Sequence, residues 1–231
     1  MVKYSNFMKN LDEIASKIEA ELNEKDDLRE KTLKKCRDII RESRKGIKAA
    51  HNDDLKEAKK HIEKAKKILN DMKKEIEKHP DLLTAGYMEN AMQEVAEAEI
   101  FLAIKEGGDF PYPEDIGVSY TSYLLGLADV VGELRRMGVY LMKNGNISEV
   151  EKILELMEEI CDKVMEFDYP SGLLPIKRKQ DVIKKVLEKM RGEVAIFKKS
   201  KELENKIEAI IRKMRKEEEK GEEAMDIDSL L

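Results

Sequence analysis

Two pairs of acidic residues stand in stretches of the sequence that are otherwise apolar. Asp129 and Glu133 lie four residues apart between Ile116 and Leu141, a stretch in which only four of 26 residues are charged. Residues four apart project from the same side of a helix, so this pair is predicted to share one face. A lone buried carboxylate costs several kcal/mol, and it is therefore usually paired, protonated or bound to a metal.

Arg136 follows Asp129 by seven residues and is predicted to lie on the same helix face. The simplest interpretation is a buried salt bridge from Arg136 to Asp129 or Glu133 that fixes the register of the helix. A second acidic pair favours another interpretation. Glu94 and Glu97 stand three apart, flanked by the apolar residues Met92, Val95, Ile100 and Phe101. If the two helices are neighbours, four carboxylates converge with one arginine.

Such a cluster predicts a bound divalent cation, because one guanidinium cannot neutralise four carboxylates and like charges repel strongly in a poorly solvated site. A set of hard oxygen ligands without Cys or His selects Mg²⁺, Mn²⁺ or Ca²⁺ over Zn²⁺. Mg²⁺ held by carboxylates can activate water and neutralise charge on a phosphoryl group, so phosphodiester hydrolysis is the predicted reaction class. The predicted ligands are Glu94, Glu97, Asp129 and Glu133.

A basic stripe on another predicted helix offers phosphate contacts. It consists of Lys34, Arg37, Arg41, Arg44 and Lys48, spaced three or four apart. The alternative is a plain solvated face, since 44 Lys and Arg residues in helices must align somewhere by chance. The cluster from Lys177 to Lys179 and three tyrosines are weaker candidates for RNA contacts, and no role is assigned to His51, His61 or His79.

The composition predicts an all-α protein. Of the 231 residues 40% are charged, while Pro numbers 5, Gly 12 and Trp 0, which is typical of long solvated helices. Apolar spacing and Gly/Pro breaks predict a single-domain helical bundle of about seven helices over residues 1–215, followed by an acidic, flexible tail at 216–231. The predicted helices cover residues 7–22, 33–50, 55–79, 81–105, 116–142, 150–164 and 176–214.

Charge and cysteine usage narrow the class of protein further. A net charge of −5 argues against a protein that coats nucleic acid indiscriminately, so any RNA-binding surface must be local. Cys36 and Cys161 form no C-x-x-C pair and are predicted to be buried free thiols in the cytoplasm. The longest uncharged run, 116–128, covers 13 residues, short of the ~18 that a membrane span needs.

Several segments resemble the translin family, and its catalytic Trax branch in particular. They are the stretches from Arg37 to Ile47, Gln93 to Ala98, Tyr123 to Met137 and Lys179 to Val194. The stretch from Tyr123 to Met137, YLLGLADVVGELRRM, is the most specific, and the resemblance covers roughly residues 30 to 200.

The resemblance implies an all-α fold that assembles into a hollow homo-oligomer, with an octamer as one such form, and holds single-stranded RNA on its inner surface. Single-stranded DNA is a second ligand in this interpretation. Trax subunits are Mg²⁺-dependent endoribonucleases, and their acidic residues correspond by motif to Glu94, Glu97, Asp129 and Glu133. Arg136 stands where the motif also has an arginine, so the resemblance implies a catalytic role for it at the scissile phosphate. The Lys/Glu-rich helices resemble archaeal or thermophile versions of the family.

Three hypotheses stay open on the sequence. The first is a Mg²⁺-dependent endoribonuclease whose RNA contacts come from Arg37, Arg41, Arg44 and Lys48. The second is a non-catalytic RNA-binding oligomer in which the same acids tie two helices together. The third is a helical scaffold without a nucleic-acid role, which would show no salt-dependent RNA binding. A carboxylate di-iron bundle fits poorly, because the sequence has no Glu-x-x-His motif.

Overall fold

The computed structural model describes residues 10–228, with side chains described to residue 215. This part of the chain contains helices and no strand, which confirms the all-α prediction. The helices are α1 (Leu11–His51), α2 (Leu55–Glu75), the 3-10 turn η2 (Pro80–Leu82), α3 (Gly86–Glu106), α4 (Pro113–Ile116), α5 (Tyr120–Lys143), α6 (Ile147–Met165) and α7 (Lys177–Asp228).

Helix α1 is longer than predicted. Two separate helices, 7–22 and 33–50, were predicted here, with a charged turn around Asp26 and Asp27 between them, but a single helix runs unbroken from Leu11 to His51. Phe7 lies outside the described residues. No Pro or Gly interrupts this stretch before Gly46, and the acids suit a solvated helix. Asp26 pairs with Arg29 one turn later at 3.3 Å. A charged run without a helix-breaking residue was therefore misread as a turn.

Residues 10–228 contain the predicted number of α-helices, seven, although the list differs. Two predicted helices merge into α1, while the short α4 was not predicted. Helix α2 ends at Glu75, before the predicted end at 79, and Pro80 begins a 3-10 turn rather than a long helix. The glycine-rich loop after α3 is as predicted, with Gly107 at a φ of 70° in the left-handed region that glycine favours.

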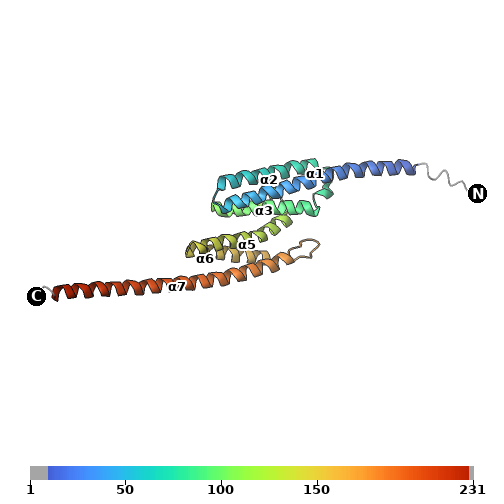
Figure 1. Cartoon of the computed structure of the whole chain (residues 1–231). Coiled ribbons are helices and arrows are strands. Elements are labelled where there is room, and N and C mark those ends of the chain that lie inside the picture. The colour runs from blue at the N-terminus through green and yellow to red at the C-terminus, as the bar shows by residue number, and fades with distance from the viewer. Residues whose placement is uncertain (1–9, 229–231) are drawn as a thin grey trace, which may run out of the picture.

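The helices pack in sequence order around two adjoining apolar clusters. Helices α1, α2 and α3 pack against one another, α3 packs against α5, and α5 packs against α6 and α7 (Figure 1). One cluster, centred on residues such as Ile39 and Met88, lies among α1, α2 and α3. The other continues through Phe101 and Leu134 toward α6 and α7. Helix α3 belongs to both clusters, so it is the element that joins the two parts of the bundle.

Both long helices extend beyond this body at opposite ends. The first turns of α1 project on one side and the last turns of α7 on the other (Figure 1). Helix α7 continues to Asp228, through most of the segment predicted as a tail. None of the described helices has the length and apolar character that a bilayer span requires. Cys36 and Cys161 are both buried and free, as predicted.

Candidate functional site

The two acidic pairs are brought together because α3 and α5 approach closely at Gly126. A Cβ atom at this position would lie 2.7 Å from the carbonyl oxygen of Gln93 and 2.9 Å from the backbone nitrogen of Glu97. Any larger residue would push the backbones apart. Since Asp129 and Glu133 follow Gly126 by roughly one and two turns, their side chains emerge from α5 beside those of Glu94 and Glu97.

Three of the four acids line one open pocket. Glu94, Glu97 and Glu133 share it with Arg136, and the wall from α1 supplies Arg44, Ile47 and Lys48. Asp129 is not part of the lining, but its charge acts on Glu97. The neighbouring helices that the sequence analysis required are therefore present. The acids are half-buried rather than fully buried, with Glu94 12% exposed and Asp129 26% exposed.

The expectation of one arginine among four acids is wrong, because other helices supply more positive charge. Arg44 of α1 donates two hydrogen bonds to Glu94, Nη2 to Oε1 at 2.6 Å and Nε to Oε2 at 3.1 Å. Lys179, in the first turn of α7, donates to Asp129 and forms an ion pair with it. Gln93 donates to the other oxygen of Asp129. These contacts tie α1, α3, α5 and α7 together at the site.

Glu133 has a partner that the sequence analysis left unassigned. His51, the last residue of α1, donates from Nε2 to Oε2 of Glu133 at 2.5 Å, and its ring lies 4.6 Å from that of Phe101. Arg136 also reaches Glu133, at 3.7 Å. The hydrogen bond from His51 lowers the pKa of Glu133, against the opposing effect of burial. Arg136 thus contacts Glu133 rather than Asp129, and its side chain is mostly exposed.

Glu97 is the acid without a cation of its own. Within the described side chains it makes no ion pair or hydrogen bond, whereas each of the other three acids has at least one partner. Burial raises its pKa to about 8, and the charges of Asp129, Glu94 and Glu133 add to this shift. The shortage of cations that was predicted for the whole cluster is therefore confined to Glu97, whose raised pKa favours the neutral, protonated form.

The arrangement of these side chains is not that of a formed metal centre. Among the described residues, no three acidic, His or Cys side chains surround a common point as metal ligands would. The physical reason is visible in the contacts above, since Glu94, Asp129 and Glu133 turn toward Arg44, Lys179 and His51. The carboxylates are close enough to influence one another, but their oxygens point at cations of the chain.

The basic stripe lies along the exposed side of α1 and leads into the pocket. Arg37, Arg41, Arg44 and Lys48 line a shallow depression beside it. Arg41 pairs with Asp38 at 2.7 Å, and Arg44 with Glu94. Within residues 10–215 neither Arg37 nor Lys48 takes part in an ion pair. Lys34, at the start of the stripe, makes no ion pair there either, so three cations of the stripe are available to an anionic ligand, and one of them, Lys48, borders the pocket.

His51 and Lys179 are the site residues that sequence reasoning missed. A signal for His51 was present, because it follows Arg44 by seven residues and so shares a face of α1 with it. Lys179 was noted within a basic cluster at the start of α7, but its partner lies 50 residues away in the sequence. Nothing in the local pattern of α7 indicates that α5 packs against it.

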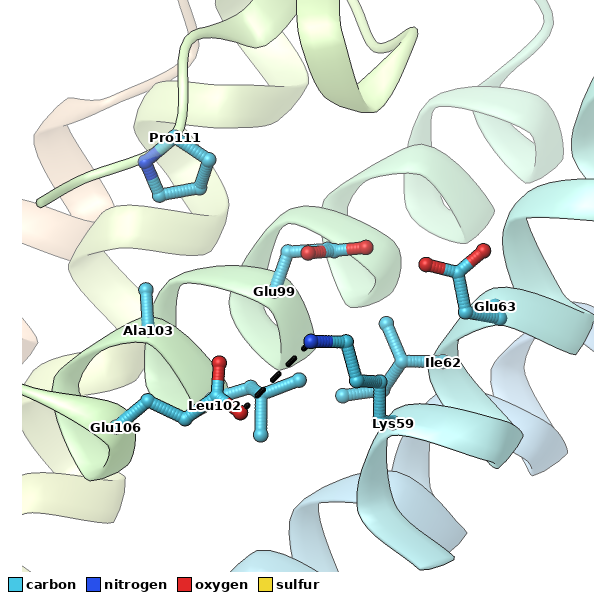
Figure 2. Close-up of a pocket in the computed structure, with 8 residues that line it drawn as sticks. All are labelled: Lys59, Ile62, Glu63, Glu99, Leu102, Ala103, Glu106 and Pro111. Atoms are coloured by element: carbon cyan, nitrogen blue, oxygen red, sulfur yellow. Dashed lines mark ion pairs between the residues drawn. The ribbon is translucent and has the colours of Figure 1, made fainter. Parts of the chain in front are cut away.

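A second acidic region lies on another side of α3, facing α2. Glu99 and Glu106 border a small groove together with Pro111 (Figure 2). Lys66 of α2 pairs with Glu99 at 2.8 Å, and Lys59 reaches toward Glu106 at 3.9 Å. Glu99 and Glu106 each face a lysine from the neighbouring helix, and Glu63 of α2 also lines the groove (Figure 2). No role was predicted for this groove from the sequence.

Comparison with known proteins places the chain in a family. The Translin family profile matches residues 27–200. The chain belongs to the translin family. An uncharacterized protein of Methanocaldococcus jannaschii is 35% identical over 181 residues, which cover 76% of this chain and 79% of that relative. The translin resemblance inferred from the sequence is thereby confirmed.

Solved structures share the fold of this translin-family chain. The crystal structure of AfC3PO is 30% identical with a TM-score of 0.73, covering 80% of this chain and 97% of that one. AfC3PO in complex with duplex RNA is 29% identical with a TM-score of 0.71 and the same coverage. The structure of apo-NeC3PO, at 20% identity and a TM-score of 0.72, shares the fold.

Proposed function

We propose that this translin-family chain binds RNA and cuts single-stranded RNA at the α3/α5 pocket with the help of Mg²⁺ or Mn²⁺, as a Trax-like endoribonuclease. The observation that carries the proposal is Glu97, a carboxyl crowded by three other acids and left without a cation. The relative AfC3PO was solved with duplex RNA, which supports RNA as the ligand class. The preference for single-stranded over duplex RNA is an additional part of the proposal, and the cleavage assay described below tests it.

The donor set suits a hard divalent cation. Glu97 would hold it together with Glu94, Asp129 and Glu133, all of which offer oxygen. The bound ion would neutralise charge that develops on a phosphoryl group during hydrolysis. Because the carboxylates now face Arg44, His51 and Lys179, metal loading requires at least some of those contacts to loosen. Affinity for the ion should therefore be modest unless a phosphate ligand draws the basic side chains away.

In this proposal the basic residues beside the acids bind the phosphates of the RNA. Arg37, Arg41 and Lys48 lie on the exposed side of α1 and would hold the phosphates of a strand that leads into the pocket. Arg136 and Arg44 border the acids, so they would contact the phosphate at the reacting position. Hydrolysis there joins the oxygen of water to phosphorus and breaks one phosphodiester P–O bond.

Cleavage of labelled RNA tests this proposal. The purified protein is incubated with single-stranded RNA, duplex RNA or single-stranded DNA, each with Mg²⁺ or with EDTA. We expect cleavage of single-stranded RNA that needs Mg²⁺ and falls at least ~100-fold in Asp129→Asn and Glu97→Gln. Glu99→Gln is the matched control, because Glu99 lies on the same helix but faces α2. Equal cleavage of RNA by the Asp129→Asn variant and by the unaltered protein would contradict the nuclease proposal.

The contacts in the pocket also favour a second candidate, a non-catalytic RNA-binding protein. Glu94, Asp129 and Glu133 each join two helices through an ion pair or hydrogen bond. In that role their substitution lowers stability while RNA binding persists and no Mg²⁺-dependent cleavage occurs. Binding itself should weaken steeply with salt, by a slope of ~0.7 per phosphate contact, and Arg37→Ala with Lys48→Ala should reduce that slope. RNA binding that does not weaken as the salt concentration rises would favour the scaffold hypothesis.

The remaining predictions from the sequence belong to the same proposal. They are a cytoplasmic homo-oligomer, with a hollow octamer as one expected form, and single-stranded DNA as a second ligand. Sedimentation of the purified chain with and without RNA measures the oligomeric state. The DNA arm of the cleavage and binding assays measures whether single-stranded DNA is a ligand.

A further inference from the structure

The two helical extensions that leave the body carry apolar side chains that nothing in one copy covers. On α1 these are Leu11, Ile14, Ile18 and Leu22, between 45% and 58% exposed. On α7 they are Leu203, Ile207, Ile211 and Met214, between 44% and 56% exposed, with Ile210 beside them at 57%. Both segments lie wholly or largely outside residues 27–200, the part that matches the family profile. A stripe of large aliphatic residues on a solvated helix normally faces a partner.

The two stripes have the same spacing when one is read backwards. From Leu11 the steps are 3, 4 and 4 residues, and from Met214 toward the N-terminus they are again 3, 4 and 4. Two antiparallel helices in this register place four pairs of aliphatic side chains opposite one another. The pairs are Leu11 with Met214, Ile14 with Ile211, Ile18 with Ile207 and Leu22 with Leu203.

The charges of the two segments are opposite in sign. Residues 11–24 contain five acidic side chains and one basic side chain, whereas residues 199–215 contain six basic and three acidic ones. A pairing between unlike segments therefore attracts, whereas pairing α1 with α1 would bring two acidic segments together. The two segments are also similar in length, each about four turns.

The two extensions of one copy cannot meet, since they leave the body at opposite ends (Figure 1). From these observations we infer that the α1 extension of one copy packs antiparallel along the α7 extension of a second copy. Every copy carries one segment of each kind, so it can make this contact twice. Two such contacts bring the buried area toward the ~1,200 Å² that stable interfaces reach. The inference does not depend on RNA binding or cleavage.

Disulfide cross-linking between differently tagged copies of the full chain tests the pairing. One copy carries Ile14→Cys and the other Ile211→Cys, and the mixture is oxidised with copper phenanthroline. We expect a cross-linked heterodimer well above the yield of either variant alone, since the native cysteines Cys36 and Cys161 are buried. Ile14→Cys with Leu203→Cys should give at least ~10-fold less, because eight residues along a helix are ~12 Å.

Two glutamate substitutions on different faces of α7 give a matched control in the same cross-linking assay. Adding Ile207→Glu to the Ile211→Cys copy puts a charge into the stripe and should reduce the yield at least ~10-fold. Ala209→Glu adds the same charge on another face of α7 and should leave the yield unchanged. Both positions are exposed in one copy, so neither change should disturb folding, which circular dichroism checks. A heterodimer yield at the single-variant background, or cross-linking of Ile211→Cys mainly to itself, overturns the inference.

Discussion

Two acidic regions on one helix differ in how their charge is balanced. On the side of α3 that faces α2, Glu99 meets Lys66 and Glu106 meets Lys59. On the side that faces α1 and α5, acids from two helices crowd together, and Glu97 is left without a cation. Each side of α3 carries two glutamates, three residues apart on the side of Glu94 and Glu97 and seven apart on the side of Glu99 and Glu106. What differs is that α2 contributes two lysines and one carboxylate, Glu63, to its region, whereas α5 contributes two carboxylates to the other.

The largest effect should be a dependence of stability on pH that arises from Glu97. Its pKa in the folded protein is about 8, above the ordinary 4.5, so the folded state holds a proton that the unfolded chain has released. Stability from this group is fully present below about pH 4.5 and is lost as the pH rises through 8. The free energy of unfolding should fall by on the order of 1 kcal/mol per pH unit in that window.

Urea unfolding in EDTA between pH 5 and pH 8 measures this slope. Glu97→Gln should flatten it, whereas Glu99→Gln should leave it in place because Glu99 already has Lys66. Excess Mg²⁺ should also flatten the slope if the ion neutralises the acids, which links this measurement to the nuclease proposal. A slope that survives in Glu97→Gln would show that the crowding of the acids is not its source.

A smaller effect should follow from changing the distance between α3 and α5. In Gly126→Ala the new Cβ would meet backbone atoms of Gln93 and Glu97 at under 3 Å, so the helices must separate. We expect a loss of about 1 to 3 kcal/mol in unfolding free energy, together with a lower pKa of Glu97 as water enters. Gly132→Ala on the same helix is the control, because its Cβ meets nothing within 4 Å. Thermal and urea unfolding compare the two variants, and equal losses would contradict this account.

The acidic pairs could be found in the sequence because the two members of each pair lie within one helical turn of each other. The spacings of Glu94 with Glu97 and of Asp129 with Glu133 fix their relative positions on a helix before any packing is known. The long uninterrupted α1 was missed because a dense run of charges resembles a turn, although it contains no residue that breaks a helix.

The partners of those acids could not be derived in the same way. Lys179 reaches Asp129 because α7 packs on α5, and His51 reaches Glu133 because α1 ends beside the middle of α5. These contacts span 50 and 82 residues of sequence, and they depend on which helix faces which. The charge balance of the site therefore follows from tertiary packing, whereas the presence of the acids follows from the local pattern.

The smallest effect should come from the α2-facing region. Lys66 and Glu99 form a partly exposed pair at 2.8 Å, and such pairs usually contribute 1 kcal/mol or less. A double-mutant cycle of Lys66→Met and Glu99→Gln should therefore give a coupling free energy below ~1 kcal/mol, weaker still in 1 M salt. A coupling free energy of ~3 kcal/mol would mean that charge interactions in this groove are as strong as those among the acids on the other side of α3. In that case the contrast between paired and crowded carboxylates would not explain why a cation is proposed to bind on only one side of α3.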